Sequence, residues 1–250
     1  MLAIIGGTGL SKLKGFNRLG VESIVTPFST SEVELGRFAS EESEFIFLPR
    51  HGVEHHLPPH SINYRANIAA LSEAGVTEIV AVNAVGAIHK DLHPGSFAVP
   101  DQIVDYSYSR DMTFFDGELK PMHHIDFSNP YSETMRQRIL KSIDTVNARR
   151  DSICAVLAGG TYACTQGPRL ETAAEVRRLA NDGCDMVGMT GMPEAALARE
   201  LEIEYASLAL SVNWAAGLSA EPITLDDIHT VLDSGMEFVA SVLTEVARGS

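Results

Sequence analysis

The chain has 250 residues, 45% of them hydrophobic, which is enough to bury a complete core in one domain. Its formal net charge of −14 offers no basic surface to a phosphate backbone, so nucleic acids and membrane surfaces are not expected as partners. No apolar run is long enough to span a membrane, and the first residues lack the basic region of a secretion signal. Three cysteines without a CxxC spacing favour reduced thiols in the cytoplasm.

Short apolar runs alternate with segments of helical periodicity, and glycine, proline or asparagine bounds most of them. We expect strands at residues 2–5, 44–48, 78–82, 153–165, 184–189 and 203–212, and an extended segment at 96–104. We expect helices at residues 63–74, 133–147, 171–181, 193–201 and 224–248. The alternation predicts an α/β fold, a single domain over residues 1–250 with a central mixed, mostly parallel sheet flanked by helices.

The second expected helix, at residues 133–147, contains three basic side chains, those of Arg136, Arg138 and Lys141. Charged side chains normally remain in water, so we expect all three on the solvated face of this helix.

Polar motifs follow the predicted strands, and open α/β sheets bind ligands at the carboxyl ends of their strands. After the first strand, Gly6-Gly-Thr-Gly9 could hold an anion through backbone N–H groups and the Thr8 hydroxyl, although a plain turn explains it equally well. After the second strand, the planar guanidinium of Arg50 offers several N–H donors in an arrangement that suits phosphate, and His51 adds a further donor. Taken alone, a surface arginine beside a core histidine is the commoner arrangement.

Three more polar residues follow predicted strands further along the chain, and each has an ordinary explanation. Glu171 could be a first-turn carboxylate favoured by the helix dipole. Thr190 could cap a helix or bind an anion at its N-terminus. Asn213 could be a plain loop residue. None of these positions is decisive by itself.

Two other kinds of site are weakly supported. His55, His56 and His60 lie near His51, but no carboxylate or cysteine completes a metal-ligand spacing, and two prolines interrupt any helix that would align the rings. We therefore expect no metal. A cysteine hydrolase based on Cys164 is the weakest alternative, because no histidine belongs to a motif with it.

The joint order of six motifs is specific where each motif is not. It resembles the trimeric purine nucleoside phosphorylase and methylthioadenosine phosphorylase family nearly from end to end. The motifs are Ile5-Gly-Gly-Thr-Gly9, Arg50-His-Gly52, Asn63-Tyr-Arg-Ala-Asn67, Asn83-Ala-Val-Gly86, Gly167-Pro-Arg-Leu-Glu-Thr172 and Gly188-Met-Thr-Gly-Met-Pro-Glu194. The resemblance implies phosphorolysis of a purine nucleoside in purine salvage, with inorganic phosphate as co-substrate and no cofactor. Small molecules would be its ligands and a homotrimer its active form.

The resemblance also implies roles for individual residues, with Asn213, Glu171 and His51 as the catalytic group. Leu170, Glu171 and Asn213 would hold the base, and Met189 the ribose. His124 would enter the pocket of the neighbouring subunit. The phosphate contacts would be Thr8, Arg50, His51, the backbone N–H of Ala84, and Thr190.

The residues expected at the base favour a 6-oxopurine. Such a base donates from N1–H and accepts at O6, whereas a 6-aminopurine reverses both. Ionised Glu171 can accept from N1–H, and the Asn213 amide can donate to O6 while accepting from a protonated N7. Adenine-directed members of the family typically carry Ser and Asp at these two positions, and a further Asp where this chain has Ala215.

The 5′ side of the nucleoside is expected against the last helix. Counting along the chain places Leu225 and Ile228 there, and an apolar wall suits a methylthio group. The expected substrate is therefore 5′-methylthioinosine. His229, next to Ile228, keeps inosine or guanosine open, and methylthioadenosine remains a second alternative. A catalytically inactive nucleoside-binding protein is the alternative from a different class.

Overall fold

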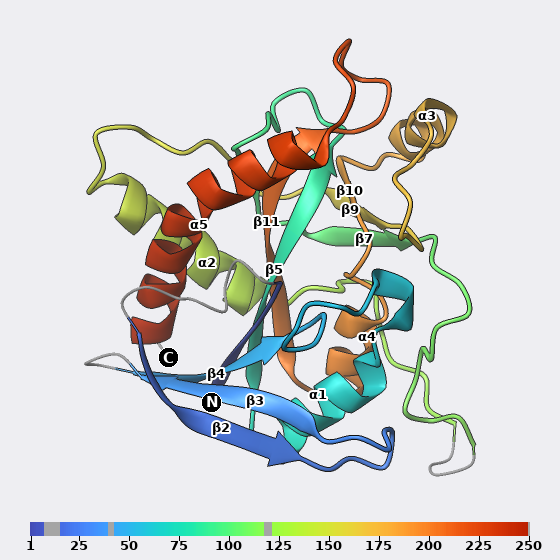
Figure 1. The fold of residues 1–250 in the computed structure, drawn as a ribbon, viewed down its shortest axis with the longest axis vertical. Helices are drawn as coiled ribbons and strands as arrows, with labels where there is room; N and C mark the ends of the chain where they lie inside the picture. Colours follow the sequence, from blue (N-terminus) through green and yellow to red (C-terminus); the bar gives the residue numbers. More distant parts are fainter. Residues whose placement is uncertain (8–15, 40–42, 118–121, 250) are drawn as a thin grey trace.

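The computed structural model describes residues 1–7, 16–39, 43–117 and 122–249. These residues form a single α/β domain around an 11-stranded sheet, shown in Figure 1. Six of its ten strand pairings are parallel and four are antiparallel. The expected mixed, mostly parallel sheet flanked by helices is confirmed.

The strands run in the order β2-β3-β4-β1-β5-β10-β9-β7, and a branch from β5 adds β11, β6 and β8. Their bounds are β1 Leu2–Gly6, β2 Asn17–Ile24, β3 Val33–Ala39, β4 Glu44–Pro49, β5 Glu78–Ala87, β6 Phe97–Ala98, β7 Gln102–Asp105, β8 Val156–Leu157, β9 Thr161–Cys164, β10 Met186–Gly188 and β11 Glu204–Trp214. The helices are α1 Tyr64–Glu73, α2 Glu133–Asn147, α3 Ala173–Asn181, α4 Glu194–Glu200 and α5 Leu225–Arg248, with a 3-10 turn at Pro59–Ser61. None of the described helices is both long and apolar enough to cross a membrane.

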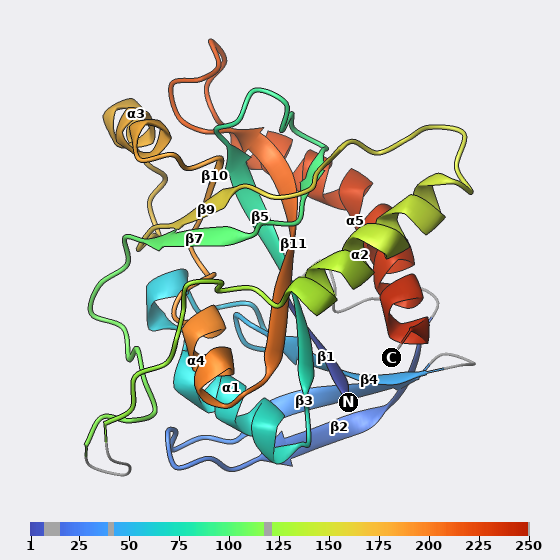
Figure 2. The ribbon, with the colours of Figure 1, turned by 180° about the vertical axis from the view of Figure 1, so that it is seen from behind.

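The two long strands β5 and β11 lie in the middle of the molecule, with helices on both sides (Figures 1 and 2). Helices α1 and α4 cover one face, and α2 and α5 cover the other. Because successive side chains of a strand point to opposite faces, Ile79 and Ala81 of β5 join the core beneath α1 and α4. Val80 and Val82 join the core beneath α2 and α5. The middle of the sheet, at β5, is thus buried on both faces.

The sheet opens along one edge of β5. On this edge β1 pairs with the first half of β5, up to Ala81, and β10 pairs antiparallel with its end, at Gly86 and Ala87. Within the described residues no strand pairs with this edge between those two points. Ala84, in the gap, is the exposed residue of an otherwise buried strand. The gap therefore leaves β5 accessible where the ends of several strands converge.

Strand β11 contains a one-residue bulge beside this opening. Ser211 pairs with Val85, and Asn213 pairs with the very next residue, Gly86, so Val212 is the extra residue. A bulge changes the direction of the side chains that follow it.

Several element boundaries differ from the sequence prediction. The β2–β3 hairpin was not predicted, since much of it is exposed and its apolar residues do not alternate cleanly. The expected strand at 153–165 is two short strands, β8 and β9, separated by Gly159 and Gly160, both at positive φ. The extended segment at 96–104 likewise divides into β6 and β7. Helix α3 begins after Thr172, which caps it, so the first-turn reading of Glu171 is wrong.

The prediction for the basic side chains of α2 is also wrong in part. Arg136 is only 6% exposed, and it donates to the carbonyls of Pro100 (2.9 Å) and Val99 (3.3 Å) and pairs with Glu133. Arg138 is half-buried and pairs with Glu78. Lys141 alone is exposed as expected. Arginine tolerates this burial because its N–H groups find carbonyl and carboxylate partners.

This difference gives a test on one helix. Arg136→Met removes the donors of two buried carbonyls, and we expect it to lower the free energy of unfolding by about 1–3 kcal/mol. Lys141→Met, the matched control on the solvated face, should change it by less than about 0.5 kcal/mol. Urea unfolding followed by circular dichroism measures both. Equal effects of the two substitutions would show that Arg136 contributes no more than a surface charge.

Candidate functional site

A cavity of about 720 Å³ fills the opening of the sheet. Its walls come from the residues that follow β1, β4 and β10, from β5 and β11, and from α5. The site residues expected from the sequence that line it are Arg50, His51, Ala84, Leu170, Glu171, Met189, Thr190, Asn213 and Ile228. Positions as far apart in the chain as Arg50 and Ile228 therefore meet in one cavity.

Arg50 forms a buried ion pair at one end of this cavity. Its Nε donates to Glu194 Oε2 at 2.7 Å and its Nη2 to Oε1 at 2.8 Å, while Nη1 donates to the carbonyl of Val82 at 2.9 Å. The side chains of Arg50 and Glu194 are each 2% exposed. Burial alone would lower the pKa of Arg50, but the Glu194 carboxylate raises it above its usual value. Arg50 is therefore a fixed cation with two N–H groups left for a ligand.

Glu194 was not given a role by the sequence prediction, although it lies in the last of the six motifs. Its Oε1 also accepts a hydrogen bond from the Tyr205 hydroxyl at 2.9 Å. A buried guanidinium requires a buried carboxylate partner. That requirement was the available signal, but 144 residues separate the two side chains, and their spacing alone could not match them.

His51 lies next to Arg50 and is held in one orientation. Its Nδ1 is 2.8 Å from the carbonyl oxygen of Leu57, and its ring packs edge-on against that of His55, 4.8 Å away. Desolvation by burial lowers the pKa of His51, as does the charge of Arg50, while the Leu57 carbonyl opposes them. The ring is therefore neutral at neutral pH.

Thr190 is positioned by a chain of buried polar side chains. The Ser207 hydroxyl donates to Asn83 Oδ1 at 2.7 Å, and Asn83 Nδ2 donates to Thr190 Oγ1 at 2.8 Å. Asn83 and Ser207 are 3% and 2% exposed and do not line the cavity. Since the Thr190 oxygen accepts from Asn83, its own proton is available to the cavity.

The cavity is also lined by a carboxylate and an amide. Glu171 Oε1 accepts from the Thr165 hydroxyl at 2.7 Å, and Asn213 Nδ2 donates to the carbonyl of Trp214 at 2.7 Å. A Cβ on Gly86 would lie 3.4 Å from Asn213 Nδ2, so the amide packs directly against this glycine of β5. Both polar residues keep an oxygen for a flat ligand that donates hydrogen bonds.

Helix α5 forms the remaining wall, from Ile228 onward. Ile228 lines the cavity as expected, but Leu225 does not and is 69% exposed. Leu225 lies three residues before Ile228 on a similar face of the helix, but the cavity does not reach as far as Leu225. His229, which the sequence left open, does line it. The additional lining residues of α5 are Leu232, Asp233 and Met236.

Two expected site residues fall outside the cavity of the single chain. Thr8 lies outside the described residues. His124 is exposed and does not line the cavity, and its expected place is in a neighbouring subunit. Its contribution therefore stays a prediction.

The cysteine-hydrolase alternative is contradicted by the position of Cys164. The thiol is 0% exposed, does not line the cavity, and contacts the backbone of Met192. Burial raises its pKa to about 12, so it is not a nucleophilic thiolate at neutral pH. Among the described residues no group of three or more His, Cys, Asp or Glu side chains could hold a metal. The absence of a metal from the functional enzyme stays a prediction.

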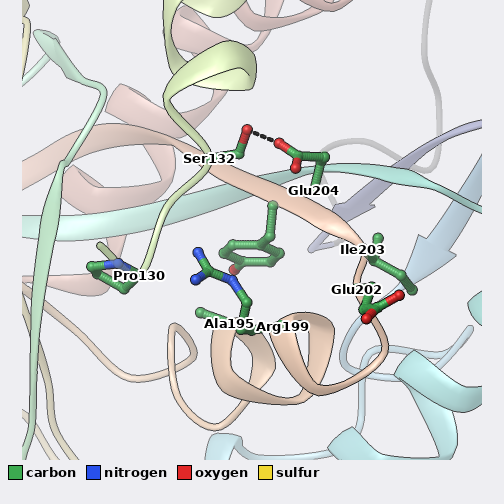
Figure 3. A pocket seen from close by; sticks show the side chains of 8 residues that line it. Pro130, Ser132, Ala195, Arg199, Glu202, Ile203 and Glu204 are labelled. Carbon is green, nitrogen blue, oxygen red and sulfur yellow. Dashed lines mark hydrogen bonds between the residues drawn. The ribbon is translucent and has the colours of Figure 1, made fainter. Parts of the chain in front are cut away.

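A second cavity, of about 380 Å³, lies between the start of α2, α4 and the start of β11 (Figure 3). It contains none of the expected site residues. The Ser132 hydroxyl donates to Glu204, and Arg199 donates to the carbonyls of Asp126 and Asn129. Its main polar groups are thus engaged by the chain itself, so we place the functional site in the larger cavity.

Comparisons with known proteins show which family the chain is similar to. The family model of the phosphorylase superfamily matches residues 2–248. The chain is 52% identical over 250 residues to a probable S-methyl-5′-thioinosine phosphorylase of Pseudomonas syringae pv. tomato, covering 99% of this chain and 98% of that one. It is 40% identical over 247 residues to a 6-oxopurine nucleoside phosphorylase of Pyrococcus furiosus, covering 97% and 90%.

The fold is similar to that of a solved phosphorylase. A methylthioadenosine phosphorylase of Schistosoma mansoni, in complex with adenine, superposes with a TM-score of 0.91 at 31% identity. The superposition covers 98% of this chain and 90% of the other.

Proposed function

Because the chain belongs to the phosphorylase superfamily, we propose that it cleaves a purine nucleoside with inorganic phosphate, and that 5′-methylthioinosine is its preferred substrate. The products are hypoxanthine and 5-methylthioribose 1-phosphate. One observation carries the proposal: a cation with hydroxyl and imidazole neighbours, and a carboxylate–amide pair, line the same cavity. These groups are the chemical complements of an anion and of a purine.

The reaction requires a phosphate oxygen to attack C1′ as the bond from C1′ to N9 of the base breaks. Positive charge develops on the ribose, and the bonding electrons pass to the purine. Arg50, His51, Thr190 and the Ala84 backbone hold the phosphate beneath C1′, where its negative charge stabilises the ribosyl cation. The oxygen of Asn213 accepts from N7–H as the base gains a proton from solvent. These interactions strengthen in the transition state, and we assign catalysis to them.

The choice of base rests on hydrogen-bond polarity. The free carboxylate oxygen of Glu171 accepts from N1–H of a 6-oxopurine, and a proton of the Asn213 amide remains for O6. An adenine ring would instead place its N1 lone pair against the carboxylate. A mismatched buried polar pair costs about 1–3 kcal/mol, so the two residues together favour hypoxanthine strongly. Leu170 covers the base, and Met189 contacts the ribose.

The 5′ wall supports a methylthio group but also suggests a second candidate. Ile228, Leu232 and Met236 offer an apolar surface of the kind that a thioether prefers. His229 and Asp233 line the same wall and could bind a 5′-hydroxyl, which favours inosine or guanosine as the second candidate substrate. Phosphate is the co-substrate in both cases, no cofactor takes part, and the cytoplasm is the expected compartment.

The product assay that tests this function compares methylthioinosine, inosine, methylthioadenosine and adenosine, each with and without phosphate. We expect phosphate-dependent base release, with kcat/KM highest for methylthioinosine and at least about tenfold lower for either adenine nucleoside. Base release that does not depend on phosphate would exclude a phosphorylase. Binding without any release would indicate the inactive nucleoside-binding protein.

The roles of Asn213 and Glu171 are tested by exchanging their polarity. Asn213→Asp still accepts from N7–H but repels O6, so kcat/KM for methylthioinosine should fall by about a hundredfold or more, and the preference should shift toward methylthioadenosine. Adding Glu171→Ser should help the adenine substrate further and non-additively, since both side chains contact one ring. Asn181→Asp, the same change at the exposed end of α3, is the matched control. An unchanged substrate ratio in Asn213→Asp would remove Asn213 from base recognition.

The proposed assembly is a homotrimer in which His124 enters the cavity of a neighbour. Light scattering should give about three times the chain mass of 27.0 kDa. His124→Ala should lower kcat/KM without dissociating the trimer. A fully active monomer would contradict the assignment of His124 to the site.

A further inference from the structure

The hydrogen bond of His51 fixes the polarity of its ring. The oxygen of Leu57, 2.8 Å from Nδ1, can only accept, so Nδ1 carries the proton in this contact. In a neutral imidazole the other nitrogen, Nε2, then carries a lone pair and no proton. The ring lines the cavity, and among the described residues no hydrogen bond to Nε2 is found. His51 therefore presents an acceptor, not a donor, to a ligand.

The neutrality of the ring follows from its surroundings. Burial lowers the pKa of His51, and the neighbouring Arg50 and His55 lower it further. The Leu57 carbonyl and Glu194 act in the opposite sense without reversing the shift. The charge of Glu194 is already paired with Arg50 at 2.7 Å, so it does not hold a second proton on His51.

The other groups at this end of the cavity are donors. Arg50 has two N–H groups left for a ligand, and Glu194 holds the guanidinium that carries them in place. The Thr190 proton is available because its oxygen accepts from Asn83. Within the described residues, this end of the cavity thus combines the donors of Arg50 and Thr190 with an acceptor at His51 Nε2. A fully deprotonated tetrahedral anion could satisfy the donors but would place an oxygen lone pair against Nε2.

We propose that this end of the cavity is built for a tetrahedral oxyanion that keeps one hydroxyl group, with His51 Nε2 accepting its proton. His51 is then a specificity-determining residue that selects phosphate over sulfate. The proposal rests on the proposed phosphorolysis, because it assigns the anion end to phosphate. At neutral and mildly basic pH inorganic phosphate and arsenate retain a hydroxyl group, whereas sulfate has none. Selection therefore depends on one proton, not on size or on the number of oxygens.

Isothermal titration calorimetry at pH 8 tests the selection independently of turnover, using phosphate, arsenate and sulfate. In the wild type we expect arsenate to bind within about tenfold of phosphate, and sulfate at least about tenfold more weakly, the cost of leaving one buried acceptor facing another. His51→Leu should weaken phosphate and arsenate by about tenfold and sulfate little or not at all, so that the preference disappears. His56→Leu, five residues further along and outside the cavity, should keep the wild-type preference.

Two results would overturn the proposal: equal affinity of the wild type for sulfate and phosphate, or an equal loss for both anions in His51→Leu. If His51→Leu does not fold, nitrogen-15 spectra of the wild-type histidine rings decide. With phosphate bound, His51 should carry its proton on Nδ1 alone, and a protonated Nε2 would contradict the proposal. A wild type that binds phosphate selectively but releases no base would refute the proposed function and leave the anion selection standing.

Discussion

The functional cavity depends on the buried ion pair between Arg50 and Glu194. A buried pair is tolerated only where the geometry is nearly ideal and the remaining polar atoms are satisfied, which here takes two short hydrogen bonds, the Val82 carbonyl and the Tyr205 hydroxyl. These partners join the end of β4, the middle of β5, the start of α4 and the start of β11. The four elements that surround the sheet opening therefore cannot shift independently. The positive charge of the site is set when the protein folds, before any anion arrives.

The side chains around Arg50 are also held in fixed orientations. His51 is oriented by a carbonyl, Thr190 by a buried amide, and Glu171 by the Thr165 hydroxyl. The three partners, Leu57, Asn83 and Thr165, do not line the cavity, and each contact determines what the remaining polar atoms of the side chain can donate or accept. Such preorganisation is the largest single contribution to many enzymatic rate enhancements, because no dipoles need to reorient during the reaction. Ser207 and Asn83 help to orient Thr190 without lining the cavity, so buried core residues also determine the geometry of the site.

The sequence predicted the alternation of strands and helices, the sheet type and most of the residues that meet in the cavity, because periodicity and strand-end motifs are local signals. Long-range partners were not accessible in the same way. Glu194 lies 144 residues from Arg50, and nothing in the spacing joins them. The burial of Arg136 was not predicted because its acceptors are backbone carbonyls, which the pattern of side chains in the sequence does not reveal. Counting along α5 gave Ile228, which lines the cavity, and Leu225, which does not, because counting alone does not show where a cavity ends.

The bulge at Val212 has a consequence for how this protein can change. In a regular strand Val212 and Asn213 would point to opposite faces, yet both line the cavity. The extra residue reverses the alternation of side chains along β11. Residues after the bulge therefore point to the face opposite to the one that the alternation before the bulge would give them. A replacement at position 213 alters what this wall of the cavity offers a ligand and leaves the strand pairing intact. Loss or gain of one residue between Ser211 and Asn213 would instead restore the upstream alternation and turn the amide out of the cavity. The lining of the cavity at this position can therefore change through point substitution but not through a change in the length of the strand.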